Sequence, residues 1–124
     1  MALKPEEWQY VDILGIEKLR YMVSTLGNVF DTVTNRNLDA SYDEKTGFAK
    51  VNLRTLRGNY KGFLIHNLVL QVFRPTKYKE AKKKKMQVVH LDGNIRNNEL
   101  ANLDFGTRQE ARKQRTKNIS KIIK

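Results

Sequence analysis

A strand–loop–strand–helix pattern occupies the chain from Met86 onward. Met86 to His90 predicts a β-strand, and the loop behind it is rich in Asn and Gly, which favour turns. Leu103 to Phe105 predicts a second strand. Thr107 and Glu110 match the capping-box pattern, which predicts a helix N-terminus there. This order of elements predicts a compact ββα unit.

The residues before this unit predict a β-rich region that ends in a short helix. Tyr21 to Ser24 and Asn28 to Phe30 flank a glycine and predict two strands around a turn. Phe48 to Arg54 alternates between apolar and polar residues, and the chain then returns through Tyr60 to Leu64, as in a hairpin. Apolar residues at helical spacing predict a short buried helix from Ile65 to Phe73.

We therefore predict an α+β fold in three parts. Residues 1–73 form a small N-terminal β-rich accessory region with its helix, which Pro75 ends. Residues 74–85 form a basic linker. Residues 86–124 form the ββα module, whose C-terminal helix is basic.

Positive charge is concentrated in the second half of the chain. The net charge is +11, from 24 Lys and Arg against 13 Asp and Glu. Residues 1–70 carry 9 basic and 8 acidic groups, whereas residues 71–124 carry 15 basic and 5 acidic groups. Such a one-sided field attracts polyanions, chiefly nucleic acid. The alternatives are a solvated lysine-rich face and a tail that binds anionic lipid, but no amphipathic membrane helix accompanies the charge.

The cations that we expect to contact nucleic acid lie in the linker, the loop and the C-terminal helix. They are Arg74, Lys77, Lys79, Lys82, Lys83, Lys84, Lys85, Arg96, Arg108, Arg112, Lys113, Arg115 and Lys117. Lysine suits phosphate oxygens, and phosphate contacts position a protein without reading sequence. Both DNA and structured RNA, including RNA within a nucleoprotein assembly such as a ribosome, fit this charge.

The segment from Met86 to Thr107 resembles the HNH endonucleases carried by phages and mobile introns. In that family a strand ends in His and is followed by D-G-N, a pair of Asn, and N-L before an aromatic residue and Thr. The matching positions are His90, Asp92, Gly93, Asn94, Asn97, Asn98, Asn102, Leu103, Phe105 and Thr107. Upstream, Ile65 to Val69 resembles a helix of the family, and Val23 to Val29 resembles its accessory motif. His66, within that helix, is expected to be structural.

The resemblance implies a site in which the hairpin and the helix hold one divalent ion, and it places His90 as the general base. The family's metal ligands are the residue before the base and the residue four positions after the motif Thr. These positions are Val89 and Ala111 here, and neither side chain has a donor atom for a metal. We therefore expect no metal site and no cofactor, with Mg²⁺ or Mn²⁺ needed only if the nuclease is active.

The expected function is nucleic-acid binding on an HNH scaffold, through the phosphate backbone and without cleavage. One alternative is an active metal-dependent nicking or homing endonuclease in which His90 is the general base. A weaker alternative is a protein-binding inhibitor that uses the same scaffold.

The absence of cysteine and of a long apolar run limits the cellular compartments that we expect for this chain. The chain has no cysteine, which excludes disulfides and thiolate metal sites and is compatible with a reducing compartment. We find no signal-peptide pattern, and the longest apolar stretch, from Gly62 to Val72, is interrupted by polar residues. We expect a cytoplasmic protein that does not enter a membrane, in the host cytoplasm if it is encoded by a phage.

Overall fold

The computed structural model describes residues 5–107, and antiparallel strands make up its three sheets. The first sheet has the order β1 (Trp8–Tyr10), β2 (Tyr21–Ser24), β3 (Val29–Asp31), β4 (Arg36–Asn37). The second has the order β5 (Ser41–Tyr42), β6 (Ala49–Arg54), β7 (Tyr60–Leu64). The third is a hairpin of β8 (Gln87–His90) and β9 (Leu103–Gly106), with the 3₁₀ turn η1 (Leu100–Asn102) before β9.

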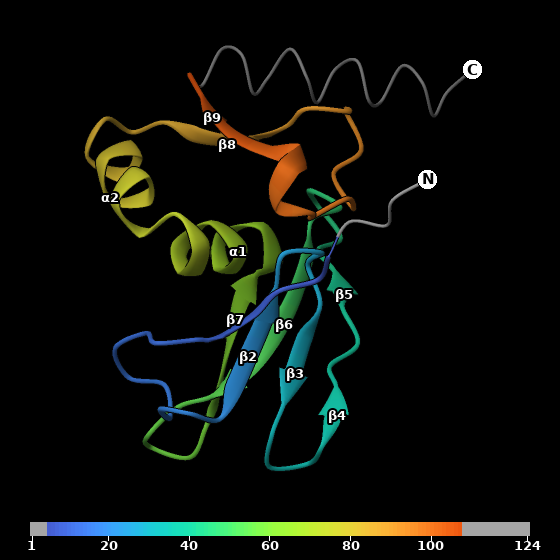
Figure 1. Cartoon of the computed structure of the whole chain (residues 1–124), viewed down its shortest axis with the longest axis vertical. Coiled ribbons are helices and arrows are strands. Elements are labelled where there is room, and N and C mark those ends of the chain that lie inside the picture. The colour runs from blue at the N-terminus through green and yellow to red at the C-terminus, as the bar shows by residue number, and fades with distance from the viewer. Residues whose placement is uncertain (1–4, 108–124) are drawn as a thin grey trace.

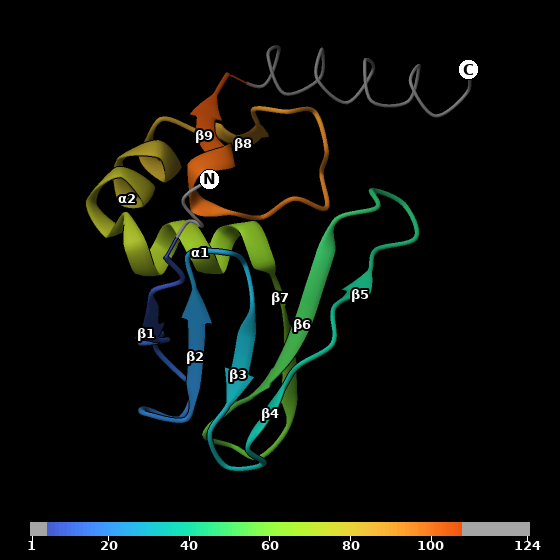
Figure 2. The ribbon, with the colours of Figure 1, turned by 45° about the vertical axis from the view of Figure 1, so that its right-hand side comes forward.

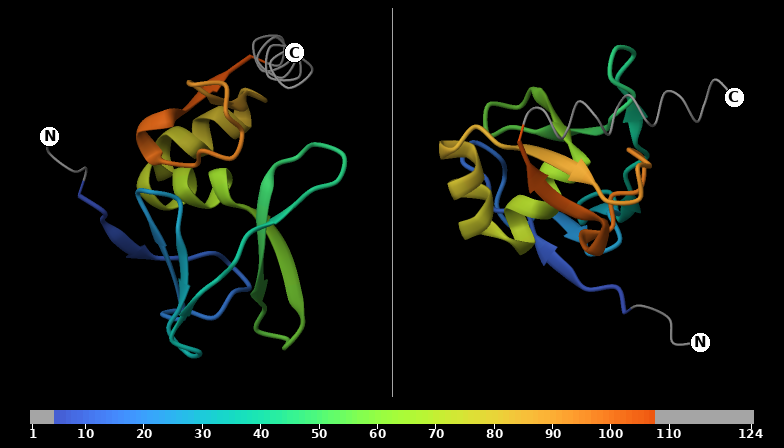
Figure 3. Two further views of the ribbon diagram at one scale, coloured as in Figure 1. Left: turned by 90° about the vertical axis from the view of Figure 1, so that its right-hand side faces the viewer. Right: turned by 90° about the horizontal axis from the view of Figure 1, so that it is seen from above.

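Helix α1 (Ile65–Phe73) is the centre of the fold. It lies between the β8–β9 hairpin on one side and the two larger sheets on the other (Figures 1 and 2). Leu68 and Val69 of α1 are fully buried, as are Val23 of β2 and Leu53 of β6. Views from the side and from above show the hairpin lying over α1 and α2 (Figure 3). One shared core therefore joins the accessory region to the hairpin.

The structure confirms most of the predicted elements. The strands around Gly27, the hairpin of β6 and β7, and the helix from Ile65 to Phe73 all form where the sequence places them. Residues 87–90 and 103–106 pair as the predicted hairpin. The helix predicted after Thr107 lies outside the described residues. The α+β class is confirmed.

Most of the predicted linker from Arg74 to Lys85 is helix α2 (Pro75–Lys83), an element that the sequence analysis did not predict. Pro75 both ends α1 and occupies the first turn of α2, where its fixed φ angle and missing N–H suit a helix start. Ala81 is the buried residue of α2, and Tyr78 is half-buried. Each described α-helix spans nine residues, too few to cross a membrane.

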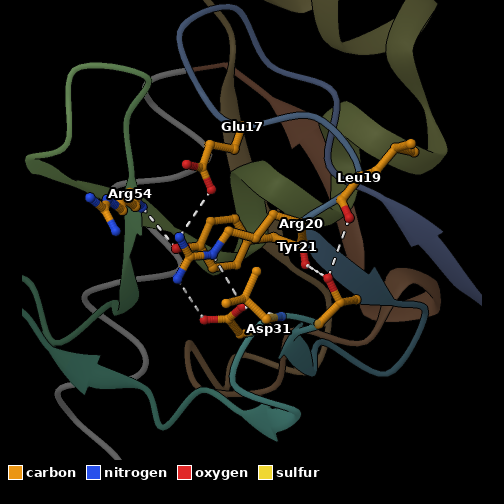
Figure 4. Close-up of polar contacts among 8 residues, drawn as sticks. Glu17, Leu19, Arg20, Tyr21, Asp31 and Arg54 are labelled. Atoms are coloured by element: carbon orange, nitrogen blue, oxygen red, sulfur yellow. Dashed lines mark hydrogen bonds and ion pairs between the residues drawn. The ribbon is translucent and has the colours of Figure 1, made fainter.

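A buried ion pair crosses the first sheet. Arg20 Nη2 lies 3.1 Å from Asp31 Oδ2, and Arg20 Nε donates to Asp31 Oδ1 at 3.2 Å (Figure 4). Arg20 is 8% exposed and Asp31 is 3% exposed. Glu17 accepts a further hydrogen bond from Arg20 Nη1 at 3.0 Å. Burial alone would raise the pKa of Asp31, but the hydrogen bond and charge of Arg20 hold it below its ordinary value.

Candidate functional site

The β8–β9 hairpin sets the direction of the motif side chains. His90 is paired with Leu103 on the face directed toward α1, where Leu103 joins the core. Val89 lies on the opposite face, where it is paired with Asp104. The side chains of His90 and Val89 therefore point to opposite faces of the hairpin.

One carboxylate organises the loop between the two strands. Asp92 Oδ1 accepts hydrogen bonds from the Asn94 backbone N–H and from Asn102 Nδ2, at 2.8 and 2.9 Å. Asp92 Oδ2 accepts a hydrogen bond from Asn97 Nδ2 at 2.8 Å. Burial alone would raise the pKa of Asp92, but these hydrogen bonds hold it below its ordinary value. The side chains of Asn97 and Asn102 thus help to hold this loop, and both oxygens of Asp92 are engaged in doing so.

His90 is turned inward and is 1% exposed. Its Nε2 lies 2.9 Å from Asn98 Oδ1, and because an amide oxygen only accepts, Nε2 carries the proton in this contact. Burial lowers the pKa of His90, although the hydrogen bond to Asn98 opposes this shift. A general base presents a lone pair to its substrate. The Nε2 of His90 does not present one in this arrangement.

The accessory region supports the loop that carries Asn98. Gly27 has a φ of +84°, and a Cβ atom at this position would lie 2.9 Å from the backbone oxygen of Asn98. The Leu100 N–H donates to the backbone oxygen of Thr25 at 2.7 Å. The turn predicted at Gly27 thus contacts the motif directly, through an approach that only a glycine permits.

His66, in the first turn of α1, is the polar neighbour of His90 that sequence reasoning placed outside the site. The two imidazole rings meet edge to face with their centroids 5.3 Å apart. His66 is 5% exposed, and its Nδ1 has no hydrogen-bond partner among residues 5–107. Burial, followed by the charges of His90 and Lys82, lowers the pKa of His66 to about 3. His66 is therefore neutral at neutral pH.

The free energy of unfolding is expected to fall as the pH drops below about 6.5, the ordinary pKa of His. In that range the unfolded chain binds a proton on His66, whereas the folded protein binds one only near pH 3. His66 alone should remove about 2 kcal/mol between about pH 7 and pH 5. Urea unfolding at both pH values measures this loss, and His66→Phe should abolish the share due to His66. The same pH dependence in both proteins would contradict the low pKa.

The predicted cations before Thr107 all reach solvent. Those in and beside α2 form a group that we call the α2 cluster: Arg74, Lys77, Lys79, Lys82, Lys83, Lys84 and Lys85. Arg96 is separate from them, in the loop after β8, where its guanidinium lies 4.0 Å from the centroid of the Tyr42 ring. The remaining predicted contacts lie outside the described residues: Arg108, Arg112, Lys113, Arg115 and Lys117.

The described residues do not fit the divalent ion that the resemblance implies. Val89 has no donor atom, and the oxygens of Asp92 accept three hydrogen bonds from the loop. Between residues 5 and 107, no three His, Asp or Glu side chains are grouped so as to hold a metal. Ala111, the other position at which the resemblance implies a ligand, lies outside this range and has no donor atom either. Asp104, paired with Val89, is a carboxylate that only the strand register reveals.

Comparisons with known proteins connect this geometry to one family. Residues 81–113 match the family model described as HNH endonuclease. A protein of Acanthamoeba polyphaga mimivirus, described as an uncharacterised HNH endonuclease, is 34% identical over 110 residues, which cover 89% of this chain and 26% of that protein. The solved HNH homing endonuclease I-HmuI, described as binding and cleaving DNA, superposes with a TM-score of 0.69 and 27% identity over 90% of this chain and 58% of its own.

The resemblance to HNH endonucleases is thereby confirmed. The family match falls on the last turn of α2, the hairpin and the residues that follow it. The structural match extends beyond them into the accessory region, since it covers 90% of this chain. The chain spans about a quarter of the length of the viral relative and just over half of the solved one.

Proposed function

We propose that this chain, which is built on the HNH endonuclease scaffold, binds duplex DNA through the α2 cluster and does not cleave it. The observation that carries the proposal is the end of strand β8. Val89 offers no ligand atom to a metal, and His90 is buried with its Nε2 hydrogen-bonded to Asn98. Phosphodiester cleavage at neutral pH relies on a metal to stabilise the charge that develops on the phosphate, and His90 alone does not replace it.

The cations that nucleic-acid binding requires, in contrast, are present. The α2 cluster places seven cations on or beside one short helix, all of them exposed. DNA is favoured over structured RNA as the partner, because the solved relative is described as binding and cleaving DNA. The contacts expected from lysine are with phosphates, so we propose binding with little dependence on sequence.

An active nicking endonuclease is the second candidate. The ordered turn at Asp92, Gly93 and Asn94 supports it, as does the exposed carboxylate of Asp104 on the same face of the hairpin as Val89. Mg²⁺ or Mn²⁺ would be required in that case.

Supercoiled plasmid incubated with the protein and Mg²⁺ or Mn²⁺ is expected to remain supercoiled, while the same protein shifts a labelled duplex in a binding assay. Robust nicking that depends on the metal and disappears in His90→Ala would overturn the proposal. The double variant Val89→Asp with Ala111→Asn, which returns an oxygen donor to both ligand positions, is the matched control. We expect calorimetry to detect Mg²⁺ binding in this variant and not in the parent protein.

A further inference from the structure

A partly open cavity lies between strand β8 and the helices α1 and α2. Its volume is about 200 Å³, and its walls include the rings of Phe48, Tyr78 and Phe105. A cavity of about 150 Å³ accommodates a benzene molecule. The space therefore admits one six-membered planar ring with a few substituents. Phe105 and Tyr78 lie with their ring centroids 6.5 Å apart, so the aromatic walls come from both β9 and α2.

An unpaired polar atom belongs to His66, which lines the cavity. Nδ1 of this residue has no hydrogen-bond partner among residues 5–107, although the side chain is 5% exposed. Buried polar groups in folded proteins are nearly always hydrogen-bonded, so an unpaired one in a residue that lines a cavity calls for a partner there. His66 is neutral at neutral pH because burial lowers its pKa to about 3. A neutral imidazole suits a neutral polar ligand better than an anion.

The positive charge beside the cavity favours a ligand that is attached to a phosphate backbone. Lys82 lines the cavity, and its Nζ lies 5.3 Å from the centroid of the Tyr78 ring. Lys79 and Lys83 are exposed on the same helix. Cations that hold a phosphate backbone against α2 bring the attached bases close to the aromatic walls. The wall composition, stacking rings beside phosphate-binding lysines, is that of sites for unpaired bases.

We propose that this cavity receives one pyrimidine base extruded from the bound DNA, stacked on the aromatic walls and hydrogen-bonded to His66 Nδ1. A pyrimidine carries both N–H donors and carbonyl acceptors at its edge, so it matches either tautomer of a neutral His. The inference rests on the proposed DNA binding and adds a specific site to it. Extrusion is least costly where the base is already unpaired.

Three labelled duplexes test the cavity in a binding titration at one salt concentration. The first is fully paired, the second has a single bulged thymidine, and the third has a bulged abasic residue that leaves the backbone shape similar but supplies no base. We expect the thymidine bulge to bind about tenfold tighter than the abasic bulge, as stacking of one base would give. Equal affinity for the two bulges, with the paired duplex still bound, overturns the cavity proposal alone. Failure to bind any duplex overturns the proposed DNA binding as well.

Two variants locate the effect. Ala81→Leu adds a side chain to the cavity wall and should reduce the thymidine preference to about one, while binding of the paired duplex stays within about twofold of the parent. Ala101→Leu, the same change at an exposed position outside this cavity, should keep the preference. His66→Phe retains a ring and removes the unpaired nitrogen. It should lower the preference without lowering the melting temperature, which keeps the test informative if Ala81→Leu does not fold.

Free thymidine distinguishes a base held in DNA from a separate nucleoside. Added in millimolar excess, it should reduce the preference for the thymidine bulge by competing for the same cavity. A preference that survives this excess would mean that the bulged base binds elsewhere and would overturn the assignment. Thymidine that binds the protein in calorimetry when no bulge preference exists would also overturn it, since the cavity would then serve free nucleosides.

Discussion

Replacing Lys79, Lys83 and Lys84 with Gln is expected to weaken duplex DNA binding by on the order of a hundredfold near about 0.1 M salt. All three residues belong to the α2 cluster and are exposed. Each phosphate contact adds about 0.9 to the slope of log affinity against log salt, so losing three should make the slope shallower by up to about 2.7. Titrations of a labelled duplex over a series of salt concentrations measure both quantities. The parent protein should lose roughly a thousandfold or more between about 50 and 200 mM salt if it contacts six to ten phosphates.

A variant with the same change in net charge separates local contacts from overall attraction. Lys18, Arg36 and Arg57 are exposed and lie in the accessory region, outside the α2 cluster. Their replacement by Gln should change the affinity by no more than about threefold, because exposed charges beyond about 10 Å are screened at this salt concentration. An equal loss in both triple variants would show that net charge, and not the α2 cluster, governs binding.

The sequence predicts the elements whose pattern is local. The helix from Ile65 to Phe73 has apolar residues at helical spacing and a proline beyond its end, and it forms with those bounds. The hairpin follows from two apolar strands around a loop of Asn and Gly, and the loop forms there with Asp92 as its hydrogen-bond acceptor. Helix α2 was missed because its lysines show no apolar periodicity and one residue, Ala81, is buried.

The candidate site depends on contacts that no local pattern encodes. His66 and His90 meet because the hairpin docks on α1, and the sequence places them on separate elements without indicating that contact. The inward direction of His90 and the pairing of Val89 with Asp104 follow from strand register, which a one-residue shift would reverse. Sequence reasoning therefore identifies the residues of the motif but not which of them are exposed. Because His90 is buried, the structure supports binding better than catalysis.

The ion pair between Arg20 and Asp31 is another contact that no local pattern predicts. It joins β3 to the residue before β2, and the sequence analysis singled out neither side chain. Asp31→Asn is expected to lower the free energy of unfolding by about 3–5 kcal/mol, because it leaves the Arg20 charge buried without its partner. This is a large fraction of the total stability of a small domain, which is about 5–15 kcal/mol. Urea unfolding at neutral pH measures the loss.

The double variant Arg20→Leu with Asp31→Leu tests whether the unpaired charge is the cause. It should recover most of the loss, since an apolar pair of similar volume replaces a buried ion pair at little cost. Asp39→Asn, at an exposed carboxylate, is the matched control and should change stability by less than about 0.5 kcal/mol. The pKa of Asp31 is depressed in the folded protein, so its contribution is present above the ordinary carboxyl pKa and is lost as the pH falls through the depressed value. Asp31→Asn should therefore lose less stability than the parent on acidification below about pH 4, and a parallel acid response in the two proteins would contradict the assigned ion pair.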